Sequence, residues 1–293
     1  MILKNSVFYL LLSVVCLSCI ACSPDVRNEN RQKKIPQKII SLAPSITEEL
    51  FLLGLEDKIT GVTTYCNRPE AALHKEKVGT VVSVNIEVIF RLDPDIIFAS
   101  PVLDPKHKTR LEGLGFNIEV FPSPRDFTQM CDQFRSLSRL TGTEEKAKLI
   151  LKNTEKRLKK IRAARTGKYR PSILVQIGTR PIYVGIPGTF INDFIEFAGG
   201  ENAASGLKTA IISREEVIRR DPEIIFIVTM GIISEHEKKE WQRFNGLRAV
   251  KNDAIFSLSA DMVCSATPAT FPDTLEIMSA YIESIQGQAG RQN

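Results

Sequence analysis

Short runs of apolar residues alternate along the chain with segments of helical periodicity. The run from 38 to 42 (KIISL) and the run from 95 to 99 (DIIFA) have the length and β-branched content of buried strands. Strand and helix patterns that alternate in this way are typical of α/β folds with mainly parallel sheets. We predict strands at 38–42, 59–63, 95–99, 116–121, 172–177, 223–228 and 254–258, and helices at 45–54, 85–92, 189–198 and 270–285.

The first of these helices carries a start signal. Ser45 and Glu48 have the spacing of a capping box, and Pro44 stands directly before them. The pattern therefore predicts a helix that opens at Ser45 and ends near Gly54.

Two segments in opposite halves of the chain are similar. Residues 85–98 read NIEVIFRLDPDIIF and residues 213–226 read SREEVIRRDPEIIF, and seven of the fourteen aligned positions are identical. Both read as a helix, an Asp-Pro stop and a buried strand. Identity at Arg, Asp and Pro exceeds what shared secondary structure demands, so we interpret the halves as two equivalent lobes.

A long helix is predicted between the halves. Residues 144–165 contain neither Gly nor Pro, and about 22 helical residues reach roughly 33 Å, enough to cross from one lobe to the other. Its apolar face is expected to be Leu149, Leu151, Leu158 and Ile161, and its Lys and Arg residues are expected to be a solvated surface. The fold class is thus α/β, with two Rossmann-like lobes of mainly parallel sheet, one long connecting helix and a ligand cleft between the lobes.

The N-terminus has the pattern of a bacterial export signal. Lys4 precedes an apolar stretch from 7 to 20, which is shorter than a membrane span. Cys22 follows Ala21 as in a lipoprotein cleavage site, although Cys19 occupies the usual Leu position and is an alternative acceptor. A plain secretory signal and a single membrane anchor are the other interpretations. The predicted organisation is a lipoprotein signal peptide (1–21), a flexible tether (22–36), an N-terminal lobe (37–142), a bridging helix (143–168) and a C-terminal lobe (169–293).

Charge and cysteine content exclude some classes of protein. The formal net charge of +5 is modest and its cations are mixed with 34 acidic residues, so no nucleic-acid partner is expected. If Cys22 is acylated, the mature body keeps Cys66, Cys131 and Cys264, which show no C-x-x-C spacing. One disulfide with a free thiol and three free thiols both remain open, and Cys131 reads as a small buried hydrophobe.

Four motifs, in this order, resemble the cobalamin and iron-siderophore class of periplasmic binding proteins. They are IISLAPSITEELFLLG from Ile39, GVTTYCNRP from Gly61, the segment from Asn85, and FAGGENAASG from Phe197. The resemblance implies two α/β lobes bridged by one helix. It also implies a non-enzymatic, monomeric, extracytoplasmic protein, lipid-anchored to the cell membrane or outer membrane, that delivers a small molecule to the transmembrane subunits of an ABC importer. Cobalamin or a related corrinoid is the expected ligand, with a ferric siderophore or haem as alternatives.

The resemblance also assigns roles to the repeated pair of glutamates. Glu87 and Glu215 match the two exposed glutamates, one per lobe, with which this class docks on permease arginines. Glu216 is an adjacent alternative. An acidic residue in the first turn of a helix also interacts favourably with the helix dipole, by about 0.3–1 kcal/mol, so both roles can hold.

The resemblance places the ligand against loops that follow the strands. The implied ligand-binding residues are Pro44, Ser45, Tyr65, Tyr183, Asp261 and Met262. Either tyrosine can stack on a flat macrocycle, or simply pack under its own loop.

The sequence departs from the cobalamin binders at the positions that usually carry aromatic side chains. Val81, Thr209 and Met262 stand there, and the only tryptophan, Trp241, lies in a charged helical run that we expect away from the cleft. Arg180 and Lys208 lie in loops where they can meet an anionic siderophore or remain solvated.

Two rival functions are weaker. A metal-ion receptor needs converging His or carboxylate ligands, but His74, His107 and His236 are far apart in charged stretches. No metal site is therefore expected. An enzyme of two doubly wound domains is the other rival, and the chain has no G-x-G-x-x-G, Walker or G-x-S-x-G motif.

Overall fold

The computed structural model describes residues 35–229 and 232–289. The predicted signal peptide and the acceptor Cys22 lie outside these residues, as does all of the predicted tether except Ile35 and Pro36. Within the described part of the chain, every helix is too short or too polar to cross a bilayer.

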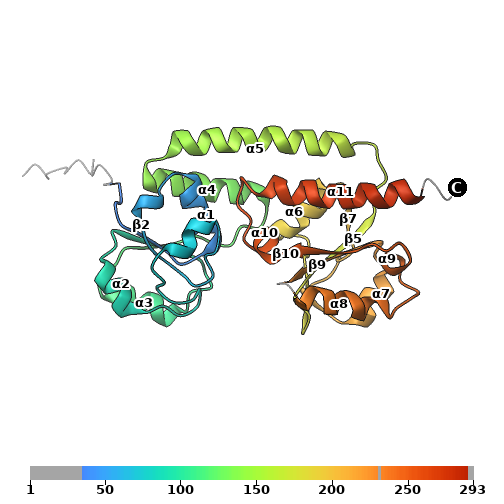
Figure 1. Cartoon of the computed structure of the whole chain (residues 1–293), viewed down its shortest axis with the longest axis horizontal. Coiled ribbons are helices and arrows are strands. Elements are labelled where there is room, and N and C mark those ends of the chain that lie inside the picture. The colour runs from blue at the N-terminus through green and yellow to red at the C-terminus, as the bar shows by residue number, and fades with distance from the viewer. Residues whose placement is uncertain (1–34, 230–231, 290–293) are drawn as a thin grey trace, which may run out of the picture. The chain divides into compact units, whose positions relative to one another are not determined.

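The N-terminal lobe, coloured blue to green in Figure 1, is built on a parallel four-stranded sheet in the order β2-β1-β3-β4. Successive residues of a strand face opposite sides of the sheet. Ile39 and Phe98 accordingly pack in one core cluster, while Ile40 and Ile97 pack in a second cluster on the other face. Burial on both faces explains why these strands read as continuous apolar runs. The strands are β1 (Ile39–Ser41), β2 (Ile59–Val62), β3 (Ile96–Ala99) and β4 (Ile118–Val120).

Helices cover both faces of this sheet. Leu50 and Phe134 join the cluster of Ile39, and Ile89 and Leu111 join the cluster of Ile40. The helices are α1 (Pro44–Leu52), α2 (Ile86–Leu92), α3 (Pro105–Gly113) and α4 (Phe127–Thr141), with the short 3-10 turns η1 (Glu56–Lys58) and η2 (Glu70–His74).

The C-terminal lobe contains a mixed sheet in the order β10-β9-β5-β6-β8, with β7 also paired to β5. β10, β9 and β5 run parallel, whereas β6 is antiparallel to both β5 and β8. The strands are β5 (Ser172–Ile177), β6 (Ile182–Val184), β7 (Glu201–Asn202), β8 (Ile211–Ile212), β9 (Ile224–Thr229) and β10 (Ile255–Ser259).

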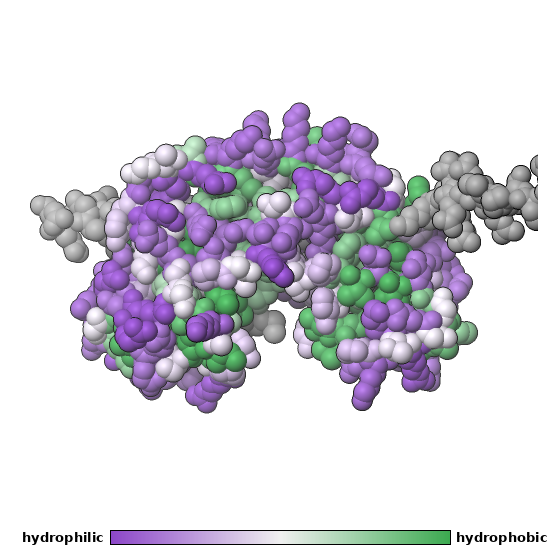
Figure 2. All heavy atoms as spheres, turned by 180° about the vertical axis from the view of Figure 1, so that it is seen from behind, coloured by the Kyte–Doolittle hydropathy of each residue, from purple (hydrophilic) through white to green (hydrophobic). Residues whose placement is uncertain are grey.

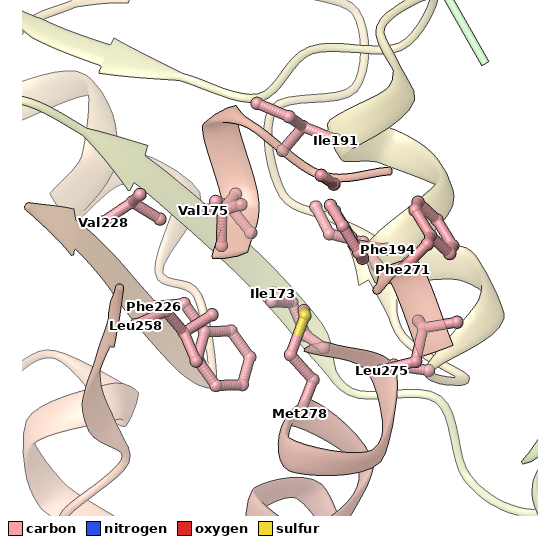
Figure 3. Close-up of a cluster of buried hydrophobic side chains, with 14 of the residues drawn as sticks. Ile173, Val175, Ile191, Phe194, Phe226, Val228, Leu258, Phe271, Leu275 and Met278 are labelled. Carbon is pink, nitrogen blue, oxygen red and sulfur yellow. The ribbon is translucent and has the colours of Figure 1, made fainter. Parts of the chain in front are cut away.

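The main core of this lobe lies between the sheet and two helices, α6 and α11. Figure 3 shows Ile173 and Phe226 of the sheet facing Leu275 and Met278 of α11. Phe194 of α6 stacks on Phe271 with ring centroids 4.0 Å apart. The helices are α6 (Phe190–Phe197), α7 (Arg214–Arg220), α8 (Ile232–Gln242), α9 (Arg248–Lys251), α10 (Ala260–Cys264) and α11 (Phe271–Ala289).

The predicted long helix is present as α5 (Glu144–Arg165), and it packs against both lobes (Figure 1). Ala147 near its start belongs to an N-terminal core cluster, whereas Leu158 and Ile161 belong to the main C-terminal cluster. The predicted apolar face was wrong in one position, because Leu149 is 60% exposed. The buried residues of α5 recur at intervals of three, four or seven positions and form one face, whereas Leu149 lies two positions from Ala147, on the opposite side of the helix.

The repeat predicted from the sequence is visible in the backbone. α2 and α7 have seven residues each, begin after a side-chain N-cap (Asn85 and Ser213), and end in a left-handed aspartate. The strand that follows pairs in both lobes with the lobe's first strand, β3 with β1 and β9 with β5. The two halves therefore share one construction, as the sequence comparison predicts.

The start of α1 corrects another prediction. Ala43 is the N-cap and its side chain makes no capping hydrogen bond, so α1 begins at Pro44 rather than after a capping Ser45. Proline is favoured in the first turn because its missing N–H has no partner there and its φ is already helical. The helix thus begins at Pro44, one residue earlier than predicted, and Ser45 lies inside its first turn.

Candidate ligand-binding site

The loop after β2 presents Tyr65 at the surface, with 52% of the residue exposed. The backbone N–H of Tyr65 donates to the Thr63 hydroxyl, 3.3 Å away. The next residue, Cys66, is fully buried, and its sulfur lies 3.1 Å from the hydroxyls of both Thr47 and Thr63. The buried thiol therefore anchors the loop, and this anchoring leaves the Tyr65 ring free to contact a ligand.

The same loop reaches the other lobe. Asn67 Nδ2 lies 3.5 Å from Asp261 Oδ2, and Arg68 Nη2 donates to the Asp261 carbonyl over 2.8 Å. Two predicted ligand-binding segments that are far apart in the sequence, one around Tyr65 and one in α10, are thus brought together. Met262 is half-buried beside Asp261, and its carbonyl accepts a hydrogen bond from Thr274 over 3.2 Å.

Tyr183 lies on a strand rather than in the predicted loop. It is the central residue of β6, opposite Ile177 of β5. Its neighbours Ile182 and Val184 are buried whereas Tyr183 is 43% exposed, because side chains alternate across a strand. The strand fixes the direction of the tyrosine more firmly than a loop does. Arg180 and Lys208 are both exposed in neighbouring loops.

Pro44 and Ser45 are half-buried in the first turn of α1. Thr47, in the next turn, contacts Cys66, so this helix start lies against the Tyr65 loop. The backbone N–H groups of a first turn have no intrahelical partners.

The two predicted docking glutamates are both exposed at the second position of their helices. Glu87 has neither a hydrogen-bond nor an ion-pair partner among residues 35–229 and 232–289. A hydrogen bond with the Ser213 side chain lowers the pKa of Glu215, so this carboxylate stays ionised. Glu216, the adjacent alternative, pairs with Arg219 and Arg220, both at 2.6 Å. Of the two neighbours, Glu216 is held in ion pairs within its own helix, whereas the charge of Glu215 faces solvent.

Metal chemistry finds no support in the described residues. Among residues 35–229 and 232–289, no group of three or more His, Cys, Asp or Glu side chains is arranged to hold an ion. His74 and His236 are exposed, and His107 is half-buried near Ser83.

The three cysteines of the body are free thiols. Cys66 and Cys131 are buried and Cys264 is exposed. Burial raises the pKa of the Cys131 thiol to about 12, consistent with its interpretation as a small hydrophobe.

The only tryptophan is in the core of the C-terminal lobe. Trp241 is fully buried, and its indole N–H donates to Gln176 Oε1 over 2.7 Å. It therefore does not supply an aromatic wall to a ligand at Tyr65 or Tyr183.

A hollow opens between the two lobes in the space-filling view (Figure 2). Two grooves lie elsewhere on the molecule. One, of about 560 Å³, runs between α1 and η2, and the other, of about 690 Å³, runs between α4 and α5. The predicted ligand-binding residues line neither groove.

The chain matches the periplasmic binding protein family over residues 39–262. It belongs to this family. A vitamin B12-binding protein of Vibrio cholerae is 30% identical over 255 residues, which cover 86% of this chain and 91% of the relative. An uncharacterized ABC transporter substrate-binding lipoprotein of Bacillus subtilis, YvrC, is 28% identical over 246 residues, 80% of this chain and 77% of the relative.

Solved structures support the assignment of this chain to the periplasmic binding protein family. The periplasmic vitamin B12 binding protein BtuF of Vibrio cholerae superposes with a TM-score of 0.73 at 29% identity, covering 86% of this chain and 98% of BtuF. A possible iron-binding protein from Staphylococcus epidermidis gives a TM-score of 0.75 at 26% identity, covering 85% and 99%. The chain is a periplasmic binding protein, and these relatives are named for what they bind or as substrate-binding proteins rather than for a catalysed reaction.

Sequence reasoning missed Arg68. It stands in the quoted motif GVTTYCNRP, but no local pattern signals that its side chain reaches the other lobe. The Asp261 carbonyl lies 193 positions away in the sequence, so only the packed lobes reveal the contact.

Proposed function

We propose that this periplasmic binding protein captures cobalamin or a related corrinoid between its lobes and delivers it to the permease of an ABC importer. The observation that carries the proposal is the meeting of the Tyr65 loop with α10, because the loop that carries this exposed tyrosine contacts Asp261 of the other lobe through Asn67 and Arg68. The similarity to vitamin B12-binding proteins along nearly the whole chain supports the choice of a corrinoid.

The proposed roles follow from the placement of each side chain. Tyr65 and Tyr183, both substantially exposed, stack on the macrocycle or donate through their hydroxyls. Asp261 and Met262 approach it from the C-terminal lobe, and Pro44 and Ser45 from the N-terminal lobe. Such a site binds a single ligand per monomer.

Calorimetric titration of a soluble protein spanning Ser23 to Asn293 with cyanocobalamin tests the proposal. We expect saturable one-to-one binding at micromolar strength or better, about −8 kcal/mol or beyond. Tyr65→Ala and Tyr183→Ala should each weaken binding, whereas Tyr169→Ala should not, since Tyr169 is 63% exposed and lies outside the predicted ligand-binding segments. Absence of binding would exclude the corrinoid.

A ferric siderophore or haem is the second candidate. The buried position of Trp241 favours it, because the one tryptophan of the chain is not available to a corrinoid. Similarity to the possible iron-binding protein of Staphylococcus epidermidis and the exposed Arg180 and Lys208 point the same way. Parallel titrations with ferric hydroxamate and catecholate complexes and with hemin distinguish these ligands, and Arg180→Ala should weaken only an anionic one.

We also propose that Cys22 carries the lipid anchor. The relative from Bacillus subtilis is named a lipoprotein, and Cys22 follows an apolar stretch and Ala21. Several acyl chains on one cysteine hold a protein stably, whereas one chain binds reversibly. Labelled palmitate should enter the wild type and the Cys19→Ala variant but not Cys22→Ala. Equal labelling of wild type and Cys22→Ala would exclude this anchor.

A further inference from the structure

Arg68 contacts both lobes through one nitrogen atom. Its Nη2 donates to Glu48 Oε2 of α1 over 2.8 Å, within its own lobe. The same nitrogen donates to the carbonyls of Asp261, over 2.8 Å, and Ser265, over 3.2 Å, in the C-terminal lobe. Nη2 carries two hydrogens, which these three acceptors share.

One carbonyl is that of Asp261, the second residue of the five-residue helix α10, and the other is that of Ser265, its C-cap. The last four carbonyls of a helix have no intrahelical partner, so in a helix this short both carbonyls are open to a donor from outside. A guanidinium is therefore a suitable group to hold this short helix. The contact lies at the predicted ligand site, since Asp261 is itself a predicted ligand-binding residue and Tyr65 stands three residues before Arg68.

Glu48 holds the guanidinium in place from the other side. Its side chain is only 12% exposed and that of Arg68 is 27% exposed, so water screens this pair less than an exposed one. Burial raises the pKa of Glu48, and the charge of Arg68 opposes that rise. The pair fixes Arg68 in the direction of α10 rather than letting it extend into solvent.

We propose that Arg68 is a positioning residue that fixes α10 and the Tyr65 loop relative to each other before a ligand arrives. The inference deepens the proposed function and rests on it for the ligand. A site that is already arranged binds more tightly, because apparent affinity falls in proportion to the fraction of molecules in the binding-competent arrangement. Arg68 contributes to ligand affinity by holding the two lobes in the binding-competent arrangement, and it does not need to touch the ligand.

Hydrogen exchange of the ligand-free protein tests the structural half of the proposal. Arg68→Ala should speed exchange of the amides of residues 260–265 by about ten-fold or more, because the helix loses its contact with the other lobe. Exchange in β9 should not change. Arg91→Ala is the matched control, since Arg91 pairs with exposed Glu76 inside the N-terminal lobe. Unchanged exchange at residues 260–265 would overturn the proposal, whatever the protein binds.

Titration of the same variants tests the functional half. Using whichever of cyanocobalamin, ferric siderophore or hemin the wild type binds, we expect about ten-fold weaker affinity for Arg68→Ala and wild-type affinity for Arg91→Ala. Arg68→Lys, which keeps a donor and a charge, should recover part of the loss and provides a folded variant if Arg68→Ala does not fold. Faster exchange with unchanged or tighter affinity would overturn the positioning role.

The two failures are distinguishable. If the wild type binds none of the three ligands, the proposed function fails, while the exchange experiment still decides whether Arg68 holds α10.

Glu48→Gln is a further test in the exchange experiment. This variant keeps the contacts of Arg68 with the two carbonyls but removes the opposing charge, so exchange at residues 260–265 should rise less than in Arg68→Ala.

Discussion

Asp93 and Asp221 adopt the same left-handed backbone conformation, with φ and ψ of 50° and 63° in one and 46° and 61° in the other. Each ends its helix immediately before a proline and a buried strand. The acidic residues two positions later also correspond: Asp95 accepts from the backbone N–H of Lys38, and Glu223 from that of Ser172. The repeat thus extends from the sequence to the hydrogen bonds that start each lobe's first strand.

The two aspartates differ in their side-chain contacts, and this predicts unequal effects of replacement by glycine. Asp221 accepts from the backbone N–H and the guanidinium of Arg248 at 2.8 and 3.0 Å, capping α9. Asp93 meets only Lys38 at 3.4 Å in an exposed pair, which is worth little. Asp221→Gly should lower the free energy of unfolding by about 1 kcal/mol through loss of the cap.

Asp93→Gly should leave stability within about 0.5 kcal/mol of wild type or raise it, because glycine adopts this conformation without the steric cost. Urea unfolding of both variants measures the difference. Equal losses would mean that the contacts of Asp221 with Arg248 contribute nothing.

Strands β1 to β5, β9 and β10 could be predicted because buried strands give continuous apolar runs, and Asp-Pro stops mark the start of two of them. The short strands β6, β7 and β8 were not predicted. Leu149 could have been excluded from the buried face by helical spacing alone, because it lies opposite Ala147 and Leu158 on α5. Tyr183 lies on a strand of only three residues, which is too short to give a recognisable pattern. The sequence does not predict side-chain contacts with residues that lie far away in the chain. Arg68 could not be assigned, since the two carbonyls that it reaches in the other lobe are more than 190 positions away in the sequence.

Glu49 predicts a pH-dependent stability. Its side chain is 3% exposed, its Oε2 has no hydrogen-bond partner in the described structure, and burial raises its pKa to about 8. Between the ordinary value of 4.5 and about 8, the unfolded chain is ionised while the folded protein keeps the proton. The folded state therefore binds more protons, and stability should fall as pH rises through this window, by at most about 1.4 kcal/mol per pH unit.

Glu49→Gln should remove most of this decline and make the protein more stable than wild type at pH 8. Denaturant unfolding at pH 5, 6.5 and 8 measures it. Glu56→Gln, an exposed change in the same region, should keep the wild-type profile. A Glu49→Gln profile parallel to wild type would show that Glu49 is ionised in the folded protein.

The buried hydrogen bonds around Trp241 predict that an apolar replacement in this core will lower the stability of the protein. Gln176 accepts from the indole N–H and donates to Glu237 over 2.8 Å, while Arg214 also donates to Glu237 and lies 4.6 Å from the centre of the Trp241 ring. Gln176→Leu leaves the indole N–H without its acceptor, so stability should fall by about 1–3 kcal/mol despite the added apolar surface.

Fluorescence of the single tryptophan reports this change directly, because the lost hydrogen bond alters the surroundings of the indole. Gln242→Leu, at an exposed position beside Trp241, should leave both the emission maximum and the urea midpoint unchanged. If the two leucine variants unfold at the same midpoint, the network contributes no net stability.

The docking role proposed for Glu87 and Glu215 predicts a separation of transport from binding. Both carboxylates are exposed, at the same position of equivalent helices, and Glu215 stays ionised. The double variant Glu87→Ala with Glu215→Ala should abolish uptake of the ligand by cells while calorimetric affinity stays near wild type. Glu216→Ala is the control, since Glu216 is already paired with Arg219 and Arg220 and should leave uptake largely intact. Lost affinity for the ligand would instead place these glutamates at the ligand site, and normal uptake by the double variant would exclude them from docking.

The dependence of docking on salt is a second test of the same role. Because attraction between exposed charges weakens as salt rises, binding of the wild-type protein to vesicles that contain the permease should fall with ionic strength, and binding of the double variant should not.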